Sequence, residues 1–154
     1  AARLALGPAE LVIDLEAKRV QVYGRIFTLQ RSQLALLSLF ARLATKGTDA
    51  VSPPTKGVPD VRWAQRYLRE LRTISGEMAN LDRTERALKD GMDGEFFSTT
   101  LSKLTAVLKV EIGSEATRNL IDDGGSRPHC YRLAIQPGYV RFERITIGNQ
   151  GAMP

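Results

Sequence analysis

The stretch Gly94–Ile112, GEFFSTTLSKLTAVLKVEI, predicts an amphipathic helix around which the rest of the chain is organised. Ser98 or Thr99 can cap its start, because a side-chain hydroxyl there can accept a hydrogen bond from an unpaired backbone amide. Apolar residues recur along it at spacings of three and four. They are Leu101, Leu104, Leu108 and Ile112. One face of this helix is therefore expected to be buried.

The other face of the same helix carries small or basic residues. They are Thr99, Ser102, Lys103, Ala106 and Lys109. Such groups can approach a phosphate backbone or a groove. A solvated helix face on a small core is the alternative, because helices that read bases usually carry more Arg, Asn and Gln. The pattern leaves both interpretations open.

Residues 11–60 precede the helical half of the chain. Short alternating stretches between Leu11 and Leu29, separated by turns at 16–18 and Gly24, predict a small antiparallel sheet. A helix is expected from Gln30 to Lys46, opened by Thr28 or Gln30 and stopped by Gly47. Its apolar face would consist of Leu34, Leu37, Phe40 and Leu43 or Ala44. Residues 47–60 contain three prolines and predict a loop.

A second helix is expected to begin at Asp60, a good N-cap residue. Its apolar side would carry Trp63, Tyr67, Leu71, Ile74 and Met78. A basic stripe falls on roughly the opposite side. The stripe consists of Arg62, Arg66, Arg69 and Arg72. Such a stripe is usually a solvated face, and a phosphate- or partner-binding face is the alternative. After a break at Ser75–Gly76, residues 77–89 predict further helix with Leu81 and Leu88 on its apolar side.

The C-terminal third predicts a short helix followed by strands. Residues 113–121 continue the amphipathic pattern, and residues 122–125 form a turn. Strands at 128–135 and 139–147, joined by Gln-Pro-Gly at 136–138, predict a C-terminal β-hairpin. Residues 148–154 should fray. The chain is thus expected to be one α+β domain, residues 1–154, with a small N-terminal antiparallel sheet, three or four helices and a C-terminal hairpin.

The residues that usually carry catalysis or bind metals are sparse. Cys130 and His129 are the only cysteine and histidine, so neither a disulfide nor a zinc-ligand set is available. They are neighbours on an expected strand, where successive side chains point to opposite faces. Asp122 and Asp123 are expected to be turn formers, and no glycine-rich phosphate loop is present. We therefore predict no catalytic residue, no metal and no cofactor for this chain.

Composition gives weaker guidance about partners and compartment. A net charge of +5 and a pI near 9.7 favour anionic partners. No apolar run approaches the length of a membrane span and no signal peptide is recognisable, so a membrane partner is not expected. A single cysteine fits a reducing, cytoplasmic setting. The chain starts without methionine and leads directly into a strand pattern, which suggests the C-terminal part of a larger protein.

The order of elements resembles a winged helix-turn-helix of the OmpR/PhoB type. The motifs that carry the resemblance are LVIDL at 11–15, VQVYGRIFTL at 20–29, QLALL at 33–37, LSKL at 101–104 and YRL at 131–133. The resemblance implies that Gly94–Val110 is the recognition helix and Ile121–Leu133 the wing. It also implies the DNA-binding effector domain of a transcription regulator.

A second resemblance is closer. Residues 85–97 (ERALKDGMDGEFF), 101–104 (LSKL) and 127–133 (RPHCYRL) are similar to the C-terminal region of CRISPR-associated proteins with an N-terminal CARF domain that resemble ring nucleases. This resemblance implies an accessory winged-helix domain in type III CRISPR antiviral defence. Its roles would be nucleic-acid contact, dimer formation, or coupling to the upstream CARF domain. A protein-interaction module is a further alternative.

If the chain binds nucleic acid, its basic and small polar residues are expected to make the contacts. They are Arg62, Arg66, Arg69, Arg72, Ser102, Lys103, Lys109, Arg127 and Arg132. None of these is expected to lie among Asn or Gln side chains, which read adenine edges. Binding is therefore predicted to be weak, charge-driven and tolerant of sequence.

Overall fold

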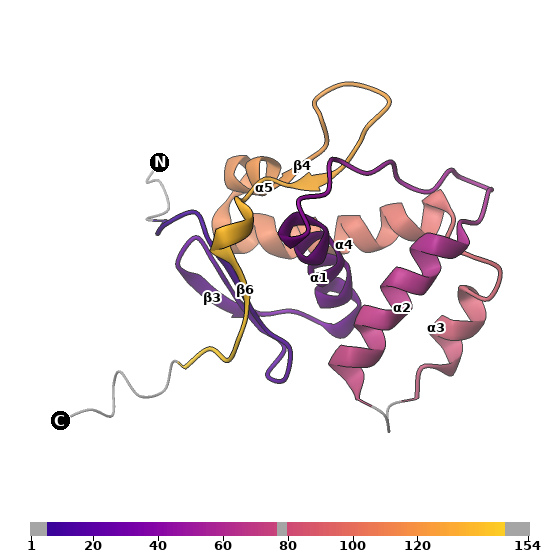
Figure 1. Cartoon of the computed structure of the whole chain (residues 1–154), viewed down its shortest axis with the longest axis horizontal. Helices are drawn as coiled ribbons and strands as arrows, with labels where there is room; N and C mark the ends of the chain where they lie inside the picture. The colour runs from indigo at the N-terminus through magenta and orange to yellow at the C-terminus, as the bar shows by residue number, and fades with distance from the viewer. Residues whose placement is uncertain (1–5, 77–79, 147–154) are drawn as a thin grey trace.

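A computed structural model describes residues 6–76 and 80–146 of the chain. Within them, a four-stranded sheet packs against one end of a group of helices, and a two-stranded hairpin carries a protruding loop (Figure 1). The predicted α+β class is confirmed. The expectations for Met78 and for residues 148–154 lie outside the described residues.

The sheet begins with the predicted antiparallel meander. It is formed by β1 (Leu11–Asp14), β2 (Arg19–Val22) and β3 (Arg25–Thr28). Leu11 pairs with Val22 and Val20 with Phe27, so the apolar side chains of the three strands share one buried face. Tyr23 and Gly24 both have positive φ, which a tight two-residue turn between β2 and β3 requires.

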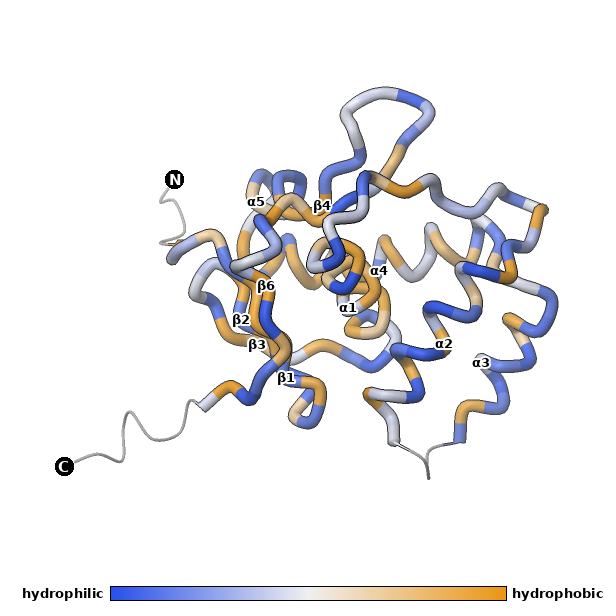
Figure 2. Tube along the Cα trace, viewed as in Figure 1, coloured by the Kyte–Doolittle hydropathy of each residue, from blue (hydrophilic) through white to orange (hydrophobic). Residues whose placement is uncertain are grey.

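Helix α1 (Arg31–Thr45) lies in the middle of the molecule (Figures 1 and 2). Its predicted location is confirmed, but its buried surface is wider than one face, because every residue from Gln33 to Ala41 is buried. The reason is that α2, α4, β5 and β6 all contact it from different directions. The Gln30 amide donates to the Gln33 side chain at its start.

Helix α2 (Val61–Ser75) follows the proline-rich loop at residues 47–60, and α3 (Asp82–Ala87) comes after α2. Asp60 caps α2 as predicted, since its carboxylate accepts a 3.1 Å hydrogen bond from the Trp63 amide. The Trp63 indole donates to the Ser52 carbonyl, which holds the proline-rich loop against the helix. Among the described residues α3 is shorter than the predicted helical segment 77–89, with Leu81 and Leu88 buried at its two ends.

Helix α4 (Gly94–Ile112) has the bounds that the sequence predicts. Leu104, Leu108 and Ile112 are buried, whereas Leu101 is only partly buried. The predicted cap was wrong. Asp93 caps the helix by accepting from the Phe96 amide at 3.0 Å, and Ser98 and Thr99 lie in its second turn, beyond the first unpaired amides.

The predicted C-terminal hairpin is wrong. After α5 (Ser114–Leu120), β4 (Ile121–Asp122) pairs antiparallel with β5 (Arg132–Leu133), and this hairpin occupies the segment expected to be the wing. A 3-10 turn at Pro137–Tyr139 then redirects the chain, and β6 (Val140–Phe142) pairs in parallel with β1. Strand β1 is therefore hydrogen-bonded to β2 on one side and to β6 on the other, and Val140 of β6 is buried.

Candidate nucleic-acid interface

A groove lined by positive charge opens between the start of α1 and helices α2, α3 and α4. Its volume is about 750 Å³. We call it the basic groove, because four of its lining residues are cations. They come from four separate segments and are Lys18, Arg31, Arg83 and Lys103. No Asp or Glu of the described residues lines it. Such an arrangement attracts anions, because no described carboxylate in the groove compensates the positive field.

Two of the four cations are positioned by the junction of sheet and α1. Lys18 lies in the β1–β2 turn with φ of 54°, and its carbonyl accepts from the Leu29 amide at 3.1 Å. This hydrogen bond holds the turn beside the start of α1. Arg31 is the first residue of α1, and its guanidinium donates to the Ser75 hydroxyl at the end of α2 at 3.4 Å. Arg31 therefore spans the distance between two of the helices that form the groove.

The other two cations come from α3 and α4. Arg83 and Lys103 are both exposed. None of the four groove cations forms an ion pair with a carboxylate in the described parts of the chain. By contrast, Arg72 lies 3.8 Å from Glu85 and Arg132 lies 3.3 Å from Asp122. The charges of the groove are thus available to an anionic ligand.

The floor of the groove is apolar and partly aromatic. It consists of Tyr67, Leu71, Leu81 and Phe96. The Tyr67 hydroxyl donates to the Ser32 carbonyl at 3.1 Å, and burial raises the pKa of this phenol. The ring of Phe96 meets that of Tyr67 edge to face, with centroids 5.7 Å apart and an interplanar angle of 80°. Phe96 is only half-buried, so part of its ring is accessible from the groove.

Neutral polar side chains complete the lining. They are Gln30, Ser32, Asn80, Thr84, Thr99 and Thr100. Asn80 and Gln30 therefore share a groove with Lys103, contrary to the expectation that the basic residues lie away from Asn and Gln. The side-chain oxygen of Asn80 accepts a 2.9 Å hydrogen bond from the Asp82 backbone amide, and this bond orients the Asn80 side chain. Amide side chains can donate and accept at base edges.

The exposed face of α4 is as predicted, but only two of its five residues line the groove. Thr99, Ser102, Lys103, Ala106 and Lys109 are all exposed. Thr99 and Lys103 line the groove, whereas Lys109 lies about 120° further around the helix axis from Lys103. Lys109 and Ser102 therefore face solvent beside the groove and do not enter it.

The arginine stripe of α2 lies on a different surface. Helix α2 presents Tyr67 and Leu71 to the groove. Arg62 and Arg69 are exposed and lie more than about 130° from Tyr67 around the helix axis. Arg66 is partly exposed on the same side, and Arg72 pairs with Glu85. The structure does not bring these arginines together with Lys103.

The basic residues of the β4–β5 hairpin are also separate from the groove. Arg127 is exposed in the protruding loop, and Arg132 pairs with Asp122. The Asp122 and Asp123 carboxylates accept from the amides of Gly124 and Gly125, both at 2.9 Å. These two aspartates are therefore turn formers, as predicted.

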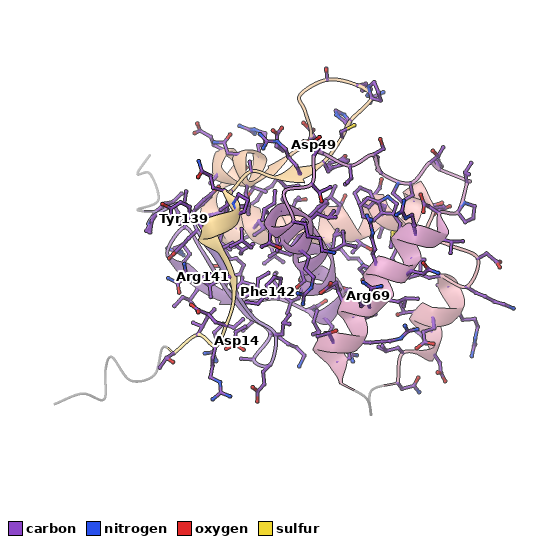
Figure 3. All side chains as sticks on the ribbon, in the orientation of Figure 1. Asp14, Asp49, Arg69, Tyr139, Arg141 and Phe142 are labelled. Carbon is purple, nitrogen blue, oxygen red and sulfur yellow. The ribbon has the colours of Figure 1, made fainter. Side chains whose placement is uncertain are left out.

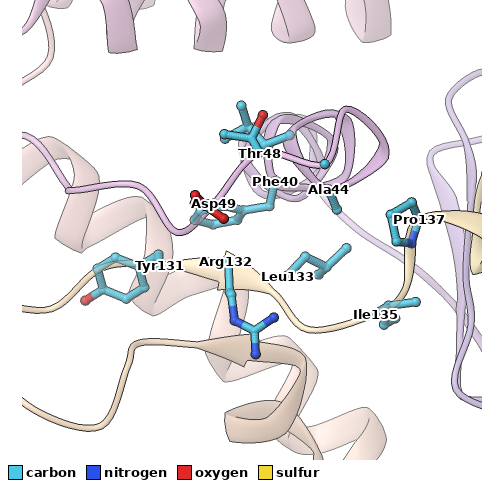
Figure 4. A pocket seen from close by; sticks show the side chains of 11 residues that line it. Phe40, Ala44, Thr48, Asp49, Tyr131, Arg132, Leu133, Ile135 and Pro137 are labelled. Carbon is cyan, nitrogen blue, oxygen red and sulfur yellow. The ribbon is translucent and has the colours of Figure 1, made fainter.

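A smaller cavity lies where the end of α1, residues 47–49 and β5 meet (Figure 4). Its volume is about 160 Å³, which is below the roughly 300 Å³ at which small-molecule pockets begin. Phe40 and Leu133 line it together with Asp49 and Arg132. It is therefore too small to be a second candidate site for a ligand of that kind.

An acidic hollow adjoins the basic groove at the start of α4. Asp90, Asp93 and Glu95 line it, and it shares Phe96 and Thr99 with the groove. A phosphate would be repelled there and attracted a few residues further along α4. The boundary between the two charge signs thus runs across Phe96 and Thr99.

Sequence reasoning found Lys103 and missed Lys18, Arg31 and Arg83. No local pattern points to them, because each comes from a different element and they meet only in the folded chain. Within residues 6–76 and 80–146, no group of three or more His, Cys, Asp and Glu side chains could hold a metal ion. None of the described helices is long and apolar enough to span a membrane.

Comparison with known proteins gave no match. No protein-family model, curated protein or solved structure matches this chain. We therefore infer function from the geometry and charge of the basic groove.

Proposed function

We propose that this chain is a nucleic-acid-binding domain that contacts phosphates through the basic groove. The observation that carries this function is the meeting of Lys18, Arg31, Arg83 and Lys103 around one groove without a described carboxylate. Phosphate contacts supply most of the affinity of sequence-tolerant binding. The acidic hollow next to the groove limits where a phosphate backbone can run.

The arrangement of elements supports a winged-helix type of fold. A β-meander precedes the buried helix α1. Helices α2 and α4 pack against α1, and the β4–β5 hairpin comes after α4 and α5. In winged helices the counterpart of α4 is the recognition helix and the hairpin is the wing. The exposed face of α4 offers Ser102, Lys103 and Lys109 but no Arg, Asn or Gln, which favours contact with the backbone over base reading.

The larger protein that we propose is a type III CRISPR-associated protein of the CARF family, with this chain as its accessory domain. Residues 85–104 and 127–133 carry the resemblance, and these two stretches are packed together. The rings of Phe97 and Tyr131 lie 5.4 Å apart. A regulator of the OmpR/PhoB type is the alternative, and a strong preference for one duplex sequence would favour it.

Charge reversal in the groove tests the proposed function. We expect wild type to bind a labelled duplex with a slope of log K against log salt near −3.6 if each groove cation neutralises one phosphate, at about 0.9 per phosphate. Arg83→Glu combined with Lys103→Glu should flatten the slope by about 2. The matched control, Arg62→Glu with Arg69→Glu, makes the same change of net charge outside the groove.

The measurement is fluorescence anisotropy at several salt concentrations, with circular dichroism to verify that each variant is folded. Equal loss of affinity in the groove and control variants would show that net charge alone attracts the ligand. Absence of binding by wild type at low salt would favour a protein-interaction module. A preference of more than about a hundredfold for one sequence would favour the transcription regulator.

A further inference from the structure

We infer that the basic groove holds an unpaired nucleotide, with its base on the apolar floor and its phosphates at the charged rim. This inference rests on the proposed function, because it specifies which form of nucleic acid the groove binds.

The floor has the chemistry of a stacking surface. Phe96 is the accessible aromatic ring of the floor, and Tyr67, which is 1% exposed, supports it edge to face from beneath while its hydroxyl is engaged with the Ser32 carbonyl. Leu71 and Leu81 are buried beside Tyr67 and add only small apolar areas to the groove lining. Bases stack on aromatic side chains with little dependence on sequence, since every base has a π face. A phosphate alone would leave this apolar surface without a partner.

The rim provides groups that suit both parts of a nucleotide. Arg31, Arg83 and Lys103 can pair with phosphate oxygens. Thr84, Thr99 and Asn80 can form hydrogen bonds with sugar or base atoms. The side-chain oxygen of Asn80 already accepts from the Asp82 backbone amide. The side-chain NH2 group of Asn80 is therefore available to donate a hydrogen bond to the nucleotide.

The size and shape of the groove favour an unpaired nucleotide over a duplex. A volume of about 750 Å³ is in the range of pockets that enclose small molecules. A duplex keeps its bases stacked inside and presents only sugar and phosphate to a protein surface unless a groove is entered. A base can reach Phe96 only from a flexible or unpaired strand. An acidic peptide could also pair with the charged rim, and competition by polyglutamate distinguishes the two ligands.

The test compares three probes of equal length with the whole chain: a 12-nucleotide DNA strand, the same strand without its bases, and the corresponding duplex. At one salt concentration we expect the intact strand to bind about 5- to 150-fold more tightly than the abasic strand, the range expected for one stacked base. The intact strand should also bind more tightly than the duplex. Phe96→Leu should reduce the preference for the intact strand and leave the affinity for the abasic strand unchanged.

A matched control is Phe142→Leu, which alters a half-buried phenylalanine in β6, outside the groove lining. It should keep the wild-type preference. Equal affinities for intact and abasic strands, or tighter binding of the duplex, would overturn the inference and leave the proposed function standing. A polyglutamate peptide that displaces the strand at the same charge concentration would also overturn it. If no probe binds at low salt, the inference and the proposed function both fail.

Discussion

At the scale of single residues, Asp14 joins β1 and the turn that follows it to a segment 131 residues further along the chain. It is the last residue of β1 and is 4% exposed. Its carboxylate accepts from the Ala17 amide in the following turn and from the Ile145 amide after β6, both at 3.0 Å. Figure 3 shows Asp14 at the end of the sheet where the chain leaves β6. One carboxylate thus fixes both the β1–β2 turn and the segment after β6.

The protonation of Asp14 should make stability depend on pH. Burial by itself raises the pKa of this carboxyl, but the two amides, Arg19 and Arg144 outweigh it, so the pKa lies below its ordinary value of 3.8. A depressed pKa contributes stability above the unfolded value and loses it as pH falls through the folded value. Asp14→Asn should therefore lower the free energy of unfolding by roughly 1 to 3 kcal/mol at pH 7.

The difference between wild type and Asp14→Asn should shrink as the pH falls below about 3.8. Urea unfolding of both proteins between pH 7 and pH 2 measures it, and Asp14→Ala serves as the variant that lacks both acceptors at every pH. A gap that stays constant to pH 2 would show that protonation of Asp14 is not linked to unfolding, and that the loss in Asp14→Asn comes only from replacing one accepting oxygen by an NH2 group.

At the scale of elements, α4 gives a test of which residue caps it. The Asp93 side chain accepts from the Phe96 amide, whereas Ser98 is exposed in the second turn. Asp93→Ala should cost about 0.5 to 2 kcal/mol of stability, the usual cost of losing an N-cap. Ser98→Ala should change stability by less than about 0.5 kcal/mol, because an exposed hydroxyl in a helix interior adds little. Thermal unfolding of both variants checks the assignment, and a larger loss in Ser98→Ala would contradict it.

The two leucines of α4 test the orientation of the same helix. Leu104 is fully buried in the core, and Leu101 is only partly buried. Leu104→Ala should cost roughly 2 to 5 kcal/mol, the range for buried leucines. Leu101→Ala should cost clearly less. Denaturant unfolding gives both values, and a loss below about 0.5 kcal/mol for Leu104→Ala would show that this face is not in the core.

Local sequence patterns predicted where helices and strands lie better than they predicted which strands pair with each other. The periods of apolar residues located α1, α2 and α4 within one or two residues, because burial of one helix side imposes that period. The pairing of β6 with β1 was not predictable, since it joins segments about 130 residues apart and the Gln-Pro-Gly turn also suits a hairpin. The cap of α4 was misplaced because Ser98 and Thr99 are also favourable cap residues.

The basic groove shows the same limit more strongly. Lys103 was a candidate because it lies on a visible helix face, but Lys18, Arg31 and Arg83 are single cations in otherwise unremarkable segments. Their convergence depends on how α1, α3 and the β1–β2 turn are placed around α4. The most basic local pattern, the α2 stripe, instead faces away from this groove. Clusters of charge along the sequence are therefore a weaker guide to a binding surface than clusters in space.

At the scale of the whole molecule, one core connects the sheet to the far helices. Leu11 and Ile13 of β1 belong to the same buried cluster as Trp63 of α2 and Phe97 of α4. Trp63 meets Phe97 edge to face, with centroids 5.1 Å apart, and Phe97 in turn contacts Phe40 of the central helix α1. Direct contacts thus run from β6 of the sheet to α1, and from α1 to both α2 and α4.

This continuity predicts that the chain unfolds in a single transition. Trp63 is the only tryptophan and is 7% exposed, so its fluorescence reports the helical end, whereas far-UV circular dichroism reports all elements. The two midpoints in urea should coincide, as in two-state unfolding of a small domain. Ile13→Val, at the opposite end in β1, should lower the free energy of unfolding by roughly 0.5 to 1.5 kcal/mol and shift both midpoints equally. If Ile13→Val shifts the circular dichroism midpoint and leaves the Trp63 fluorescence midpoint in place, the sheet and the helices are separate cooperative units. In that case the sheet would unfold before the helices, and the basic groove would then lose Lys18 and the support of the β1–β2 turn.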